Sequence, residues 1–353
     1  MTVDYLVIGQ GLAGTWVSYF LEKENRSFHV IDREDRDSAS RVSAGIINPV
    51  TGRRLVNSWM IEELIPFVET HYHQLGADLQ VQAISRKTIA DFFPTPQMRL
   101  AFTQRMSEGS DYLRFPEDDN EWDGQFNYTF GFGKIAPAFI AHLDRILPAW
   151  RNHLVKEEKL SMDDFSHEAL QIHADHVRYR DIEAKKIIFC EGYSGYHQSL
   201  FQSLPYSEVK GESLIIESTD IPASHIFKKG LILAPMSSPG FFWVGSNYLW
   251  EFQDAQPTPL FREETEKLLK AWLKVPFRVL DHLAGIRPTT LERRPFVGIH
   301  PHHPSVAILN GLGTKGCSIG PFFAKQLVNH LLHDTPIQPD ADLRRFHKTL
   351  ADK

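Results

Sequence analysis

The sequence predicts an α/β protein in which a parallel sheet is assembled from discontinuous segments of the chain. A second domain is expected to carry a mixed or antiparallel β-sheet with helices. Two observations predict this fold class. Short apolar strands run into glycines at the start, middle and end of the chain, at Gly9, Gly192 and Gly311. Between them, residues 210–217 and 241–248 have the composition of strands in a separate sheet.

The first predicted strand leads directly into a glycine-rich motif. Residues 3–8 form a short Val- and Ile-rich run, and Gly9-Gln10-Gly11-Leu12-Ala13-Gly14 follows before helical spacing begins. In a Gly-x-Gly-x-x-Gly turn, the first glycine allows the tight turn and the second lets a pyrophosphate approach the backbone. The third lets the helix lie close to the strand. A Rossmann-like dinucleotide site is therefore predicted; the alternative is a glycine-rich turn without a ligand.

A second strand, residues 27–31, supports the dinucleotide site because it ends on Asp32, 18 residues after Gly14. A carboxylate at this position binds an adenosine ribose and disfavours a 2′-phosphate. The polar loop 33–43 leads to Ser43-Ala44-Gly45, a small-residue stretch that we expect to pass close to a second part of the cofactor. The alternative interpretation is an ordinary surface loop.

The remaining elements follow from periodicity and proline placement. Helical spacing predicts helices over 55–75, 135–150 with Pro137 in the first turn, 261–273, and 322–332 with Pro321 at the first position. Further strands are expected at 126–132, 169–173, 177–179, 186–190 and 306–310.

Composition limits the class of protein. The 353 residues are 42% hydrophobic and 23% charged, as in a globular protein, and the net charge of −6 argues against a large nucleic-acid footprint. Cys190 and Cys317 fit a reducing compartment and have no metal-ligand spacing. No apolar run reaches the roughly 18 residues of a membrane span, and the first strand leaves no room for a signal peptide. We therefore expect a cytoplasmic protein without a metal.

Near the C-terminus, Gly285-Ile286-Arg287-Pro288 precedes Gly311-Leu312-Gly313-Thr314-Lys315-Gly316 and another helix. With the N-terminal motif, these stretches resemble the D-amino-acid-oxidase-like family of FAD-dependent oxidoreductases, which includes glycine and sarcosine oxidases. The resemblance implies a glutathione-reductase-type FAD-binding domain over 1–82, 135–205 and 284–353. It implies a substrate (cap) domain over 83–134 and 206–283. Where the family has an Ala-Gly pair in mid-chain, this sequence has Glu191-Gly192.

The resemblance also implies roles for individual residues. Arg287 would bind a substrate carboxylate, and Tyr248 would place a hydroxyl beside the substrate; the alternatives are a salt bridge from Arg287 to Glu292 and a core tyrosine. Lys315 would stabilise the negative charge of reduced flavin, or it would contact substrate or solvent. Non-covalent FAD is expected, with the following contacts: Gly9, Gly11, Leu12, Ala13, Gly14, Asp32, Arg33, Arg41, Ser43, Ala44, Gly45, Ile46, Glu191, Gly192, Tyr193, Arg287, Gly311, Leu312, Gly313, Thr314, Lys315 and Gly316.

The favoured function is oxidation of the C–N bond of an amino acid or N-substituted glycine, with oxygen or another acceptor reoxidising the flavin. A second hypothesis is oxidation of a tRNA side chain, because residues 41–49 resemble the matching loop of a bacterial tRNA-modifying oxidase domain. A third, from another class, is a non-catalytic flavin-binding protein. An NAD-dependent dehydrogenase would share only the first glycine motif.

Overall fold

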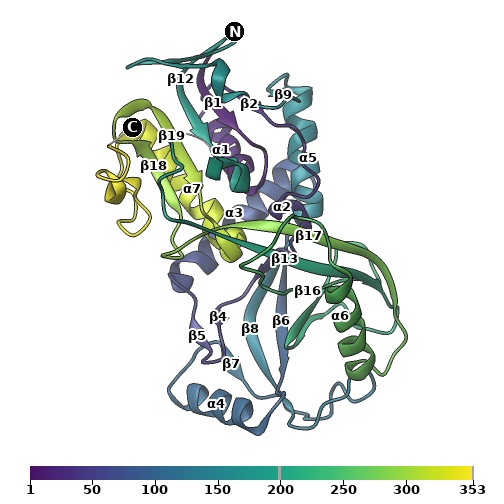
Figure 1. The fold of residues 1–353 in the computed structure, drawn as a ribbon. Helices are drawn as coiled ribbons and strands as arrows, with labels where there is room; N and C mark the ends of the chain where they lie inside the picture. Colours follow the sequence, from purple (N-terminus) through teal and green to yellow (C-terminus); the bar gives the residue numbers. More distant parts are fainter. Residues whose placement is uncertain (198–199, 352–353) are drawn as a thin grey trace.

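We describe a computed structural model of the chain, covering residues 1–197 and 200–351. Two large sheets form the two halves of an elongated molecule, with both termini in the half that holds the first sheet (Figure 1). The long strands β13 (Tyr206–Glu217) and β17 (Arg278–Thr290) pair along their lengths and run across the middle, where the halves meet. The predicted fold class, α/β with two sheets assembled from discontinuous segments, is confirmed.

The first sheet has a parallel centre. Its strands lie in the order β9-β2-β1-β12-β19, and an antiparallel hairpin, β10-β11, and the strand β18 extend it. Their bounds are Thr2–Ile8 (β1), Phe28–Ile31 (β2), Leu160–Ser161 (β9), Leu170–Ile172 (β10), Val177–Tyr179 (β11), Ile182–Phe189 (β12), Phe296–His300 (β18) and His303–Asn310 (β19). Because parallel strands end at one edge, Gly9, Gly192 and Gly311 come together although they are far apart in sequence.

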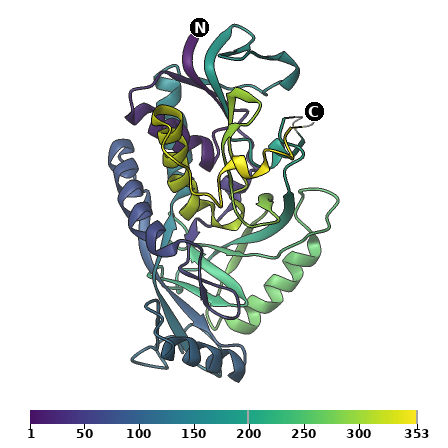
Figure 2. The same ribbon diagram turned by 90° about the vertical axis from the view of Figure 1, so that its left-hand side faces the viewer.

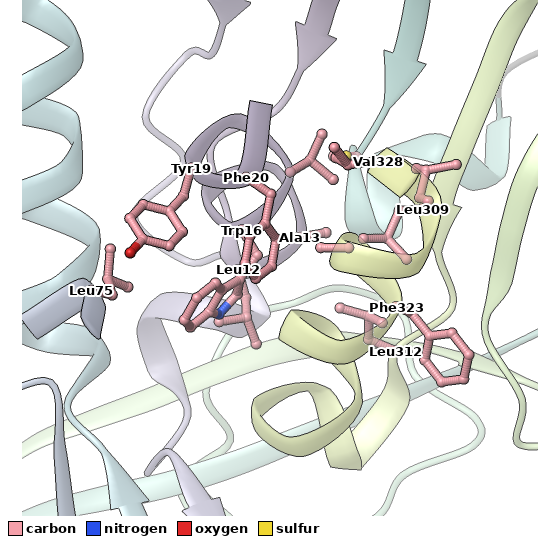
Figure 3. Packing of buried hydrophobic residues seen from close by; sticks show 14 of the residues in the cluster. Leu12, Ala13, Trp16, Tyr19, Phe20, Leu75, Leu309, Leu312, Phe323 and Val328 are labelled. Carbon is pink, nitrogen blue, oxygen red and sulfur yellow. The ribbon is translucent and has the colours of Figure 1, made fainter. Parts of the chain in front are cut away.

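Four helices pack against this sheet: α1 (Leu12–Lys23), α3 (Ile61–Leu79), α5 (Leu143–Lys156) and α7 (Gly316–His333). Trp16 of α1 is fully buried, with its ring edge-on to Tyr72 of α3 at 4.9 Å between centroids. Figure 3 shows Tyr19 of α1 facing Leu75 of α3 on one side. Leu309, Leu312, Phe323 and Val328 lie on the side of α1 that faces α7. This shared core fixes the starts of α1 and α7 next to each other.

The second sheet is mixed. Its order is β17-β13-β16-β15-β14-β6-β8-β3, with β7 also on β8; β14 and β6 are parallel and the other pairs antiparallel. The remaining bounds are Ile46–Ile47 (β3), Ile84–Phe92 (β6), Leu113–Arg114 (β7), Phe132–Ala141 (β8), His225–Lys229 (β14), Leu231–Pro235 (β15) and Phe241–Gly245 (β16). The helices α4 (Pro96–Ser107) and α6 (Pro259–Trp272) lie at the periphery of this half (Figure 2).

The prediction of a helix over 135–150 is wrong for the first half of that range. Residues up to Ala141 form β8, and α5 begins only at Leu143. Pro137 lies where the register between β6 and β8 shifts, between Lys87 and Ile89. A residue without an N–H is tolerated at such an irregularity, so this proline marks a bulge instead of a helix start.

The expected start of the last helix is also wrong. α7 begins at Gly316, so Pro321 lies inside the helix. Proline cannot donate to the carbonyl four residues earlier, at Cys317, and the Tyr72 hydroxyl donates to that carbonyl instead, at 3.0 Å. The α3 side chain therefore supplies the hydrogen bond that the proline cannot make.

Two smaller expectations also fail. The alternating stretch 126–132 is not a strand before Phe132, because the Asn127 N–H donates to the carbonyl of Trp272 at the end of α6. The expected helix 55–75 begins only at Ile61, with α3. Val56–Asn57 (β5), in its first part, instead pairs with Val50–Thr51 (β4) in a hairpin. No helix in the described part of the chain is long and apolar enough to cross a membrane. The division into two domains remains a proposal.

Candidate active site

A cavity of about 800 Å³ opens at the carboxyl edge of the first sheet and extends onto β13 and β17. This volume is within the range of small-molecule sites, roughly 300–1,000 Å³. The cavity is lined by the turn after β1, by the loop 33–46, by the segments that follow β9, β12, β16 and β19, and by residues of β13 and β17. The cavity thus connects the predicted dinucleotide site with Arg287.

The glycine turn after β1 forms one wall. Gly9 has a φ of +94°, and a Cβ there would lie 2.6 Å from the Cys190 carbonyl oxygen, so only glycine fits. A Cβ at Gly14 would overlap the Gly9 carbonyl, which shows how closely α1 approaches the turn. The Leu12 N–H at the start of α1 donates to Ser40 Oγ at 3.0 Å. Ser40 therefore lies at the predicted pyrophosphate site, and the sequence carried no signal for it beyond a polar loop.

Asp32 is held at the cavity wall by three donors. Oδ2 accepts from the Gln10 N–H at 2.8 Å, and Oδ1 accepts from the Glu34 N–H at 2.9 Å and from Arg151 Nη1 at 2.6 Å. Arg151 is buried, which strengthens this charge-assisted contact. Arg151 was not predicted, because a helical pattern does not show which polar residue turns toward the interior.

The segment after β12 also lies at the carboxyl edge of the first sheet. Glu191, Gly192 and Tyr193 line the cavity, and the Gly192 carbonyl accepts from Asn310 Nδ2 at 2.8 Å. Glu191 Oε1 lies 3.2 Å from His167 Nε2. The departure from the Ala-Gly pair thus places a carboxylate beside a histidine at this wall.

The cavity fits FAD in several respects. The N-terminal ends of α1 and α7 both reach it, and such ends favour anionic groups. A Cβ at Gly45, whose φ is +69°, would overlap the Ala141 carbonyl, so the loop 33–46 packs closely on β8 as it passes the cavity. Asp32 would bind the ribose, the turn at Gly11 the pyrophosphate, and the residues after β19 the flavin.

At the other end of the cavity, Arg287 of β17 has a largely buried guanidinium. Nη2 donates to Ser246 Oγ at 2.6 Å, and Nη1 donates to the Asn247 carbonyl at 3.3 Å. The Tyr248 ring lies 4.7 Å from the guanidinium carbon, and 56% of the Tyr248 residue is exposed. Burial lowers the pKa of Arg287 from its ordinary value.

Arg287 has no anionic partner among the residues that the structure describes. Glu292, the alternative partner considered from the sequence, lies 3.3 Å from Arg345 Nε. A buried cation without a carboxylate is costly, and this favours a site for an anionic ligand.

Most predicted contacts line the cavity. They are Gly9, Gly11, Leu12, Ala13, Asp32, Arg33, Arg41, Ser43, Ala44, Gly45, Ile46, Glu191, Gly192, Tyr193, Tyr248, Arg287, Leu312, Gly313, Thr314 and Gly316. Gly14, Gly311 and Lys315 are not among the lining residues. Lys315 Nζ lies 3.1 Å from Ser58 Oγ and 3.4 Å from the Asn48 carbonyl, and burial lowers its pKa to about 8.

Other lining residues were not predicted, among them Gly211, Trp243 and Ser246. Trp243 Nε1 donates to the Val42 carbonyl at 2.9 Å and so ties β16 to the loop that covers the cavity. Gly211 could have been found, because an isolated glycine inside a predicted strand often marks a close approach.

Comparison with known proteins agrees with this geometry. Residues 162–330 match the family model of the DAO, or FAD-dependent oxidoreductase, family. The chain is similar to this family over that segment. The match identifies it as an FAD-dependent oxidoreductase, with FAD as its cofactor.

Solved structures share the fold of this oxidoreductase at low identity. Glycine oxidase from Bacillus cereus is 16% identical with a TM-score of 0.78, covering 95% of this chain and 96% of that one. Iminodiacetate oxidase from Chelativorans sp. BNC1 is 16% identical with a TM-score of 0.77, and the match covers 95% of this chain and 96% of that one. L-α-glycerophosphate oxidase from Mycoplasma pneumoniae, with FAD bound, is 14% identical with a TM-score of 0.69, and the match covers 97% of each chain. Their names cover different substrates, so the fold does not identify the substrate of this oxidoreductase.

Proposed function

We propose that this oxidoreductase oxidises the C–N bond of an amino acid or N-substituted glycine, using non-covalently bound FAD. The observation that carries the proposal is Arg287, a largely buried guanidinium at the cavity wall without a carboxylate partner among the described residues. A guanidinium forms a planar, bidentate pair with a carboxylate and stays charged at any working pH. A substrate carboxylate would supply the missing anion.

The chain's own residues bind and orient the substrate. A guanidinium has five N–H donors, and two are used by Ser246 and the Asn247 carbonyl, which leaves others for a substrate. The Tyr248 ring packs on the guanidinium and limits its movement. When bound, FAD would supply the acceptor for the hydride that leaves the substrate carbon. No protein base is required if the substrate amine is already neutral, and we assign none.

An anaerobic screen tests this function. The holoenzyme is mixed without oxygen with amino acids and N-alkyl glycines, and the flavin absorbance is followed. We expect bleaching with at least one carboxylate-bearing amine and little with the matching amide or decarboxylated amine. Equal reduction by carboxylate-free amines would contradict the assigned substrate class.

A further inference from the structure

The guanidinium of Arg287 lies directly over a glycine of the neighbouring strand. In the β13–β17 ladder, Arg287 is paired with Val209 and Gly211 with Gly285. The arginine side chain therefore reaches along β13 by two residues. A Cβ built at Gly211 would overlap three guanidinium atoms, Nη2, Cζ and Nη1. Any other residue at 211 would force the guanidinium out of its observed place.

The backbone of β13 does not itself need a glycine here. Gly211 is paired regularly in the strand, and its φ lies outside the left-handed region that favours glycine. Glycine is usually unfavourable in a strand interior, because it adds chain entropy to the unfolded state and packs no side chain. The reason for glycine at this position is therefore the arginine above it.

The other contacts of Arg287 come from the segment after β16, and β13 holds this segment in place. The Glu212 N–H donates to Asn247 Oδ1 at 2.8 Å, and Lys210 and Leu249 exchange two backbone hydrogen bonds of 3.0 Å. We call Gly211, Ser246, Asn247 and Tyr248 the arginine cradle. Gly211 gives the guanidinium room, two members accept hydrogen bonds from it, and Tyr248 packs on it.

We propose that Gly211 is a positioning residue, which sets the plane of the Arg287 guanidinium so that its free N–H groups meet a substrate carboxylate. This inference rests on the proposed function, because it assumes that the ligand of Arg287 is a carboxylate. It goes further in assigning orientation to a residue without a side chain. Gly211 acts through Arg287 alone.

The test compares Gly211→Ala, Arg287→Lys and the double variant as holoenzymes. Benzoate and benzamide, matched in size and different in charge, are titrated while the flavin absorbance is followed. Gly211→Ala should weaken benzoate binding about ten- to a hundredfold, as a displacement of the order of 1 Å can do. Benzamide binding should change little. With a substrate from the screen, KM should rise more than kcat falls.

The double variant separates positioning from a general structural effect. A lysine at 287 has no planar fork to overlap a Cβ, so Gly211→Ala should have almost no effect on benzoate binding in the Arg287→Lys background. Gly124→Ala is the matched control, because a Cβ at Gly124 meets nothing within 4 Å; it should behave as wild type. If Gly211→Ala lowers the folded yield, recovery of that yield in the double variant supports the overlap.

Two results would overturn the inference, and they are distinguishable. Unchanged benzoate affinity in Gly211→Ala would remove the positioning role and leave the proposed function intact. Equal loss of affinity in the Arg287 and Arg287→Lys backgrounds would mean that Gly211 acts on the strand and not on the arginine. If Arg287→Lys binds benzoate as wild type does, the proposed function fails first, whatever Gly211 does.

Discussion

A largely buried guanidinium without a carboxylate is the residue-scale feature on which the substrate class depends. Removing Arg287 would leave a substrate carboxylate desolvated in the cavity without its charged, bidentate partner. Such a loss costs roughly 3–5 kcal/mol, so Arg287→Ala should lower kcat/KM by about two to four orders of magnitude. Arg287→Lys should recover part of this, because an ammonium lacks the planar fork.

FAD content should remain near wild type in both arginine variants, because Arg287 lies at the substrate end of the cavity. Thermal stability should change little, because removing a largely buried cation that has no anionic partner offsets the loss of its hydrogen bonds to Ser246 and the Asn247 carbonyl. Steady-state kinetics and the flavin-to-protein ratio check the prediction. If Arg287→Ala instead loses FAD or unfolds, while a carboxylate-free amine is oxidised as well as an amino acid, then Arg287 is structural.

Lys315 gives a second residue-scale prediction, which depends on pH. Its pKa is lowered to about 8 by burial, so the ammonium is present at pH 7 and is lost as the pH rises through about 8. If this charge stabilises reduced flavin, Lys315→Met should lower the reduction potential at pH 7 by tens of millivolts, since about 30 mV corresponds to 1.4 kcal/mol.

The difference between the two potentials should shrink as the pH rises from 7 to 9, because the wild-type amine loses its proton over this range. Redox titration of both proteins at pH 7 and pH 9 measures this. A potential that is unchanged at pH 7 would mean that the charge serves only the contacts to Ser58 and Asn48.

At the scale of elements, the segment between β16 and α6 is fastened to β13 at both of its ends by Glu212. The Glu212 N–H donates to Asn247 Oδ1, and its fully buried carboxylate accepts from the Thr258 N–H at 2.6 Å and from Thr258 Oγ1 at 2.9 Å. Glu212→Gln would bring an amide NH₂ against these donors and should destabilise the protein by about 1–3 kcal/mol.

Hydrogen exchange should also become faster across residues 247–258 in Glu212→Gln, and urea unfolding gives the stability change. Glu266→Gln is the control, because Glu266 belongs to a surface ion pair with Arg262 on α6 and should be nearly neutral. If both variants exchange and unfold like wild type, Glu212 does not hold the segment.

Elements also show what the sequence could predict. Strand ends at the three glycines and the helices after two of them were predictable, because turn chemistry and periodicity are local. Pro137 and Pro321 both led to wrong predictions of where a helix begins, for different reasons. Each was interpreted as a helix start, but one lies at a bulge set by β6 and the other inside α7, where Tyr72 makes the missing hydrogen bond. Both outcomes depend on residues distant in sequence.

The candidate site shows the same limit. Motif residues such as Gly9, Asp32 and Arg287 were predictable because their spacing carries the chemistry. Ser40 and Arg151 were not, because each reaches the site from a loop or helix whose orientation is set by tertiary packing. Gly211 lay between these cases: an isolated glycine in a predicted strand was visible, but its arginine partner was not.

At the scale of the whole molecule, the residues that line the cavity come from both sheets and from the N-terminal and C-terminal parts of the chain. A cofactor bound there should therefore stabilise the entire folded state. Binding to the folded state alone adds about 2.7 kcal/mol when free FAD is 100 times its Kd. The Tm should therefore rise by several degrees with FAD and continue to rise with FAD concentration. Thermal unfolding of apoprotein across an FAD series measures this.

Gly11→Val tests whether this stabilisation acts through the glycine turn. A Cβ at Gly11 would already lie 3.2 Å from Ser40 Oγ, and the added methyl groups would extend into the place expected for the pyrophosphate. The variant should therefore show no FAD-dependent rise in Tm, whatever the Tm of its apoprotein. FMN, which lacks the adenosine that Asp32 would bind, should stabilise the wild type less than FAD does. An equal FAD-dependent rise in Gly11→Val would mean that the pyrophosphate does not lie at this turn.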